Sequence, residues 1–171
     1  VIDAGTGTDT LITTETTSTI TDNHFTNVSN MEKLTLTNTA GDLNLTTGGA
    51  FNAAFPDGFT LATGVMATTK VVAINAGLAN VPMTIVVDAT DMVGATANKD
   101  VTVTTGSAAD KVTITGDVTW VGATGAGSSI VIGTGASDDT ISVTIGALVV
   151  QTTDQAITIT GGTSTSASST G

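Results

Sequence analysis

The sequence predicts an all-β protein with little or no helix, in which the strands form a parallel β-solenoid or, alternatively, an antiparallel β-sandwich. Short segments alternate threonine with aliphatic residues, which places the aliphatic side chains on one face of a strand. Clusters of Gly, Asn and Asp, which favour turns, separate these segments. Strong helix formers are scarce, since Glu15 and Glu32 are the only glutamates and arginine is absent.

The alternating segments recur along most of the chain, about 8–12 residues apart in their densest stretches, a spacing typical of sandwiches, barrels and solenoids. Valine, isoleucine and threonine are β-branched and favour strands. We therefore expect strands at residues 34–36, 43–45, 101–103, 112–114, 118–120, 130–132, 141–145 and 157–159.

We expect one elongated β domain over residues 1–160. Residues 48–100 are less repetitive and predict an insertion or a second sheet, with room for a short helical turn between Gly48 and Gly58. Residues 161–171 consist almost entirely of Gly, Ser, Thr and Ala. Such a tail has too little apolar surface to order itself, so we expect a linker or a strand ordered by a neighbouring subunit.

The charge balance excludes several classes of partner. Fifteen acidic residues face four basic ones, all lysines, and the net charge is −11. Nucleic acid binding requires cations that neutralise phosphates, so we expect none. An anionic membrane surface would repel the chain, and no apolar run approaches the roughly 18–20 residues that a membrane helix needs. An acidic surface is better suited to divalent cations.

Three turns share one pattern, in which Gly lies four residues before Asp and an aliphatic residue lies two after it. They span residues 4–11, 105–112 and 134–141. Gly allows a tight turn with its carbonyls pointing inward, and Asp adds a carboxylate, which together supply the oxygen ligands that calcium prefers. The candidate calcium ligands are Asp138, Asp139, Asp110 and Asp9. The alternative is that each Asp only caps its turn through hydrogen bonds.

Asp138 and Asp139 are the strongest pair on the sequence alone, because adjacent carboxylates at one turn repel each other unless a cation is bound. A complete site needs about six to eight oxygen ligands. Asp110 and Asp139 are 29 residues apart, so long coils must bring the turns together before they can share an ion.

The three turns resemble a degenerate form of the calcium-binding nonapeptide of RTX proteins, with Asp9, Asp110 and Asp139 on its Asp position. Residues 25–36 are similar to a segment of large bacterial RTX-type adhesins and S-layer proteins. The resemblance covers about half the chain. It implies a β-roll-like solenoid, secretion to the extracellular space or cell surface, and calcium-assisted folding or assembly.

The sequence contains no recognisable catalytic set, so we expect a protein that is not an enzyme. His24 is the single histidine, and no partners for a triad or a zinc site are signalled. Glu15 and Glu32 lie in threonine-rich contexts without the aromatic platform of a glycosidase. We interpret Asp88 and Asp91 as turn residues. Trp120 is expected to be a core or interface anchor.

These features predict a structural subunit or module of an extracellular bacterial assembly, such as an S-layer, filament or sheath. Open strand edges and solenoid ends expose unpaired backbone groups, and nothing in the sequence resembles a dedicated polar cap. We expect copies of the same chain as partners, joined through β edges with the help of calcium. The alternative is a module of a giant RTX-type adhesin that binds a ligand or a cell-surface glycan.

Overall fold

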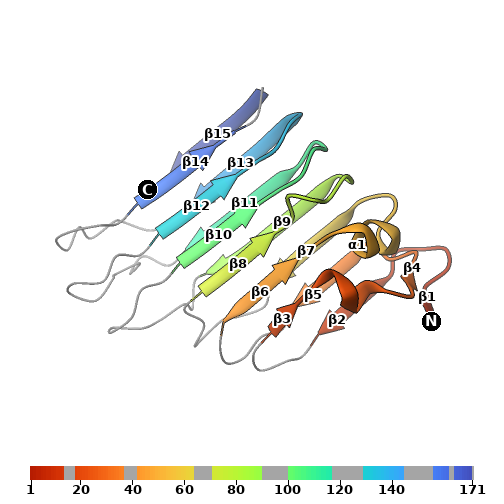
Figure 1. The fold of residues 1–171 in the computed structure, drawn as a ribbon. Coiled ribbons are helices and arrows are strands. Elements are labelled where there is room, and N and C mark those ends of the chain that lie inside the picture. The colour runs from red at the N-terminus through yellow and green to blue at the C-terminus, as the bar shows by residue number, and fades with distance from the viewer. Residues whose placement is uncertain are drawn as a thin grey trace.

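A computed structural model describes residues 1–13, 18–36, 42–63, 71–89, 100–116, 129–144, 156–161 and 164–170. These residues form a parallel β-solenoid, as predicted (Figure 1). Every strand pairing among the described residues is parallel, so the antiparallel sandwich is wrong. The helices in the described ranges lack the length and apolar composition of a membrane span.

The chain passes back and forth between two large sheets, so that each coil contributes one strand to each sheet. The seven-stranded sheet has the order β15-β13-β11-β9-β7-β5-β2 and the six-stranded sheet the order β14-β12-β10-β8-β6-β3, with a small β1-β4 sheet beside them. The strands are β1 (Ile2–Asp3), β2 (Thr10–Thr13), β3 (Ser18–Ile20), β4 (Val28–Ser29), β5 (Lys33–Leu36), β6 (Leu43–Thr46), β7 (Phe59–Thr63), β8 (Val71–Asn75), β9 (Met83–Ala89), β10 (Asp100–Thr104), β11 (Lys111–Gly116), β12 (Ser129–Gly133), β13 (Asp138–Thr144), β14 (Ala156–Thr160) and β15 (Ser164–Thr170).

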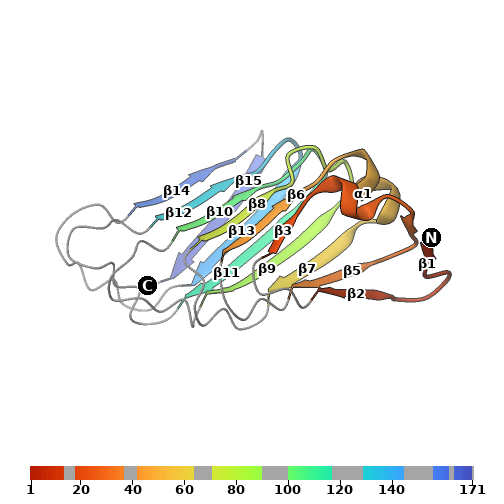
Figure 2. The same ribbon diagram turned by 60° about the horizontal axis from the view of Figure 1, so that its bottom comes forward.

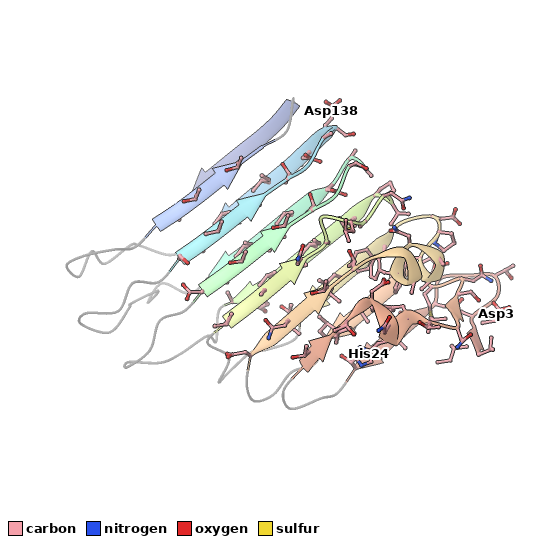
Figure 3. All side chains as sticks on the ribbon, in the orientation of Figure 1. Asp3, His24 and Asp138 are labelled. Carbon is pink, nitrogen blue, oxygen red and sulfur yellow. The ribbon has the colours of Figure 1, made fainter. Side chains whose placement is uncertain are left out.

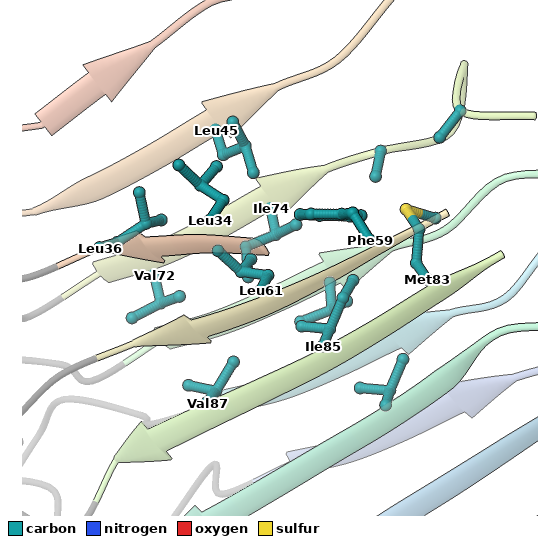
Figure 4. Packing of buried hydrophobic residues seen from close by; sticks show 14 of the residues in the cluster. Leu34, Leu36, Leu45, Phe59, Leu61, Val72, Ile74, Met83, Ile85 and Val87 are labelled. Carbon is teal, nitrogen blue, oxygen red and sulfur yellow. The ribbon is translucent and has the colours of Figure 1, made fainter. Parts of the chain in front are cut away.

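The two large sheets lie face to face and enclose the core (Figure 2). Inward positions form apolar columns because strands in register repeat the same alternation. One column on the seven-stranded sheet contains Leu34, Leu61, Ile85, Val112 and Ile141, each at most 1% exposed. Leu61 and Ile85 face Val72 and Ile74 of the other sheet (Figure 4). Burying one such side chain contributes about 1.5–3 kcal/mol.

An aromatic corner covers the N-terminal coils, where α1 (Gly49–Ala54) and the 3-10 helix η1 (Asp22–Phe25) lie together. All four phenylalanines meet there, with ring centroids 4.7–5.8 Å apart. The Asp22 carboxylate accepts hydrogen bonds from the amides of Ala50 and Phe51 at the start of α1. A side chain on Gly48 would collide with that carboxylate, with its Cβ 2.8 Å from Asp22 Cγ.

The described residues between 48 and 100 belong to the same solenoid, because β7, β8 and β9 are ordinary members of the two large sheets. Their less repetitive sequence reflects the aromatic corner, and the helical turn expected between Gly48 and Gly58 is α1. Residues 164–170, expected to be a linker or an assembly strand, form β15, which pairs with β13 of the same chain. The strand expected at 118–120, with Trp120, and the residues Glu15 and Asp91 lie outside the described residues.

Candidate functional site

One row of residues runs along the edge at which the strands of the seven-stranded sheet begin, and we call it the corner column. Each member is either the first residue of its strand or directly adjacent to that first residue. In register along the sheet, the column consists of Asp9, Glu32, Phe59, Met83, Asp110, Asp139 and Thr165. Asp9 and Glu32 begin the column, Phe59 and Met83 occupy its middle beside the aromatic corner, and Asp110 and Asp139 precede Thr165 at its other end.

The structure places three of the four candidate calcium ligands in the corner column. Asp110 and Asp139 are neighbours there, whereas Asp9 lies at the other end of the solenoid. Asp138 and Asp139 do not converge, because successive residues of a strand point to opposite faces. Asp138 is exposed at the tip of β13 (Figure 3), and Asp139 is 2% exposed. The carboxylates that meet are therefore those of Asp110 and Asp139.

Each of these two carboxylates accepts a hydrogen bond from the coil before it. The Asp110 amide donates to Asp139 Oδ1 at 2.9 Å, and the Met83 amide donates to Asp110 Oδ1 at 2.9 Å. The second oxygen, Oδ2, is buried without a hydrogen-bond partner in both residues. Each carboxylate thus has one bonded oxygen and one that remains available to a ligand or a proton.

Burial raises the pKa of the Asp110 carboxyl above its ordinary value. The hydrogen bond from the Met83 amide offsets part of this rise in pKa, while the negative charge of Asp139 adds to it. The hydroxyls of Thr105 and Thr134 are themselves buried and lack a hydrogen-bond partner. Buried charge of one sign is costly in an apolar interior, so this corner favours a bound cation or a proton.

The glycines of the second and third turns are required by the stacking of the coils. A Cβ on Gly135 would lie 1.7 Å from the carbonyl oxygen of Gly106, and a Cβ on Gly106 would lie 1.7 Å from that of Ala79. The Ser137 hydroxyl also donates to the Ser107 carbonyl at 2.8 Å. This steric reason for glycine holds whether or not the turns bind a metal.

The first turn differs, since nothing lies within 4 Å of a Cβ built on Gly5. Gly5 and Gly7 have φ values of 83° and 139°, in the region that favours glycine. In this turn glycine is needed for its positive φ, whereas in the other two turns it is needed because the neighbouring coil leaves no space for a Cβ. The three turns therefore share a sequence pattern for two different physical reasons.

Further acidic residues cap neighbouring coils and are not distinguished by the sequence motif. Glu32 Oε2 accepts the Asp9 amide at 2.7 Å. At the start of the strands of the six-stranded sheet, Asp42 accepts the amide of Val71, and Asp100 accepts the amide and hydroxyl of Ser129. The sequence feature that could have identified these capping residues is an acidic residue at or next to the first residue of an alternating segment.

The corner fits a hard cation in chemistry but supplies few ligands by itself. Two carboxylate oxygens and the Thr105 and Thr134 hydroxyls are available, against about six to eight oxygens for calcium. Among the described residues, no three His, Cys, Asp or Glu side chains gather into a metal-binding group. His24 lies elsewhere, in η1, where its Nδ1 accepts the Thr21 amide at 2.9 Å.

No family model, curated protein or solved structure matches this chain. The fold defines it as a parallel β-solenoid whose acidic corners bind backbone amides of neighbouring coils.

Proposed function

We propose that the protein is a structural module of an extracellular bacterial assembly, such as an S-layer, filament or sheath, built by stacking solenoid coils on one another. The supporting observation is that, among the described residues, both large sheets end in strands with one partner only: β2 and β3 at one end, and β14 and β15 at the other (Figure 1). Such edges present unpaired N–H and C=O groups that another strand can pair with.

The core is also open at the last coil of the described residues. Ile157 of β14 is 40% exposed, although its register neighbours Ile130, Val101 and Val72 are at most 1% exposed. A further coil placed on β14 would cover Ile157 as β14 covers Ile130. The apolar area buried there would favour stacking in addition to the backbone hydrogen bonds.

Electron microscopy and sedimentation of the purified chain over a range of concentrations test this function. We expect filaments or sheets whose amount rises with concentration, because assembly through edges follows mass action. Only monomers, at every concentration and with calcium present or absent, would exclude the assembly function.

Calcium is the proposed ligand of the Asp110–Asp139 corner, where it would neutralise the carboxylates of two consecutive coils. Support comes from the buried, unpartnered oxygens of Asp110, Asp139, Thr105 and Thr134. We expect calcium to raise the melting temperature of the chain, while magnesium has a smaller effect because it gives up its water less readily. Equal melting temperatures in calcium and in a chelator would contradict this proposal.

The outer face of the seven-stranded sheet favours a glycan-binding module as the second candidate. Thr60, Thr84 and Thr140 lie in one row with Lys33 and Lys111, facing away from the core. Parallel strands are about 4.8 Å apart, so the row presents polar groups at a regular spacing. Binding of the monomer to immobilised glycans, lost on Thr84→Val, would favour this candidate, and a glycan array without signal would exclude it.

A further inference from the structure

The hydrogen bonds from amides to carboxylates along the corner column all have the same polarity. The Asp9 amide donates to Glu32 Oε2, the Met83 amide to Asp110 Oδ1, and the Asp110 amide to Asp139 Oδ1, at 2.7–2.9 Å. In each case an amide of one coil meets the carboxylate of the following coil. An acidic residue in this column therefore caps the coil that precedes it.

Asp9 is the first member of the column and has no such amide. Nothing in the described ranges precedes β2 in its sheet. Asp9 Oδ2 is buried without a hydrogen-bond partner, like the Oδ2 atoms of Asp110 and Asp139. The carboxylate of Asp9 thus repeats the arrangement seen in the last coils, but the donor that would complete it is missing from the described part of the chain.

Thr165 is the last member of the column, and its amide has no carboxylate of a following coil to which it could donate in the described part of the chain. It is in register with Asp139, and its strand β15 has a neighbour on one side only in the described part of the chain. Thr165 holds the same column position in its coil as Asp110 does in an earlier coil. The Thr165 amide therefore corresponds to the Asp110 amide, which donates to the carboxylate of the following coil. One end of the solenoid therefore offers a column amide, and the other end offers a column carboxylate.

Building on the proposed assembly function, we propose that copies of this chain join head to tail, with the Thr165 amide of one copy donating to the Asp9 carboxylate of the next. Strand β15 would then pair in parallel with β2 of the next copy, and β14 with β3, continuing both sheets. A head-to-tail contact that does not close into a ring produces an open filament.

The same register continues the core across the junction. It places position 167, which is in register with Ile141, opposite Leu11, which is in register with Leu34. Leu11 is only half-buried, although Leu34 is fully buried, and Ile157 at the other end is 40% exposed. Stacking in this register would cover the incomplete apolar columns at both ends.

Cysteine cross-linking tests the polarity and the register together. The chain has no cysteine, so Thr10→Cys with Ser166→Cys introduces the only two thiols. Thr10 and Ser166 lie at opposite edges of the seven-stranded sheet, six strand spacings or about 29 Å apart, which is too far for a disulfide within one copy. Across the proposed junction they would be direct neighbours.

On mild oxidation we expect a ladder of covalent oligomers in non-reducing gels, which collapses to monomer on reduction. Either single cysteine variant can yield at most dimers. The shifted pair Thr10→Cys with Ser168→Cys should cross-link far less, because it requires a two-residue slip in register. Filaments without a ladder would overturn the head-to-tail register and leave the assembly function standing, whereas monomers alone would overturn both.

Substitutions of Asp9 test the hydrogen bond itself. Asp9→Ala should raise the critical concentration for filament growth about tenfold, because it removes a charged acceptor. Asp9→Asn keeps an acceptor oxygen and should stay closer to the wild type. Asp57→Ala is the matched control, since it removes the same charge from an exposed turn. Equal effects of Asp9→Ala and Asp57→Ala would overturn the role of Asp9, provided that melting curves show both variants folded.

Discussion

Single residues in this protein are constrained by the residue directly above or below them in the next coil. Gly135 is the strongest example, because the Gly106 carbonyl occupies the place of its Cβ. Gly133, only two residues earlier, has open space around the same position. The contrast separates glycines that the stacking requires from those that it merely tolerates.

Gly135→Ala should lower the free energy of unfolding by about 2–3 kcal/mol, because backbone must shift to admit the methyl group. Gly133→Ala should have little effect, or stabilise slightly by restricting the unfolded chain. Urea denaturation of the two variants under conditions that keep the chain monomeric provides the measurement. Similar losses in both variants would contradict the stacking interpretation.

The buried charge of Asp110 predicts a pH dependence of stability. Its pKa is raised in the folded state, so its contribution to stability is complete below the ordinary value of 3.8 and is lost as the pH rises through the raised pKa. Asp110→Asn stays neutral and keeps an oxygen for the Met83 amide. In a chelator at neutral pH we expect this variant to be more stable than the wild type, by about 1 kcal/mol.

With calcium present, we expect the wild type to be more stable than Asp110→Asn, because the bound ion would neutralise the wild-type carboxylates and the substitution weakens the site. Thermal melts of both proteins, with calcium and with chelator, from acid to neutral pH measure both effects. An equal rise in melting temperature on adding calcium to the two proteins would show that calcium does not act at the Asp110–Asp139 corner. A pH profile of stability that Asp110→Asn leaves unchanged would show that Asp110 is not the titrating group.

At the scale of secondary-structure elements, the two ends of the solenoid have different turns. In the last coils, glycines stack on backbone and carboxylates cap amides. In the first coils, α1 and four phenylalanines fill the corresponding space, and Asp22 fixes the start of α1. Short helices have little stability of their own, so α1 depends on this cap and on packing.

Asp22→Ala should therefore lower the free energy of unfolding by about 1–2 kcal/mol, since it leaves two amides of α1 without their acceptor. Asp57→Ala again serves as the control for lost charge on an exposed turn. Urea denaturation compares the two variants, and an Asp22→Ala variant as stable as Asp57→Ala would show that α1 is held by its aromatic packing alone.

At the scale of the whole molecule, the net charge of −11 opposes the association of copies. Screening by salt reduces repulsion between exposed charges, with a Debye length of about 30 Å at 0.01 M and 8 Å at 0.15 M. Raising the ionic strength over this range should lower the critical concentration for assembly several-fold, as measured by light scattering. Assembly that weakens with added salt would indicate contacts between opposite charges, which stacked backbone edges do not require.

The sequence by itself determined the local structure of this protein. Alternating threonine and aliphatic residues specify strands with one apolar face, and the predicted segments at 43–45, 112–114 and 130–132 all lie in observed strands. The shared turn pattern also grouped Asp9, Asp110 and Asp139, and the structure places all three in the corner column.

Only the tertiary structure decided which of these residues meet. Solenoid and sandwich satisfy the same alternation, so the pairing of Asp110 with Asp139, 29 residues apart, follows from coil length and register rather than from any local pattern. The same register separates Asp138 from Asp139, because neighbours along a strand point to opposite faces. It also makes Glu32 a cap for Asp9, and it leaves Asp9 and Thr165 at opposite ends of the column.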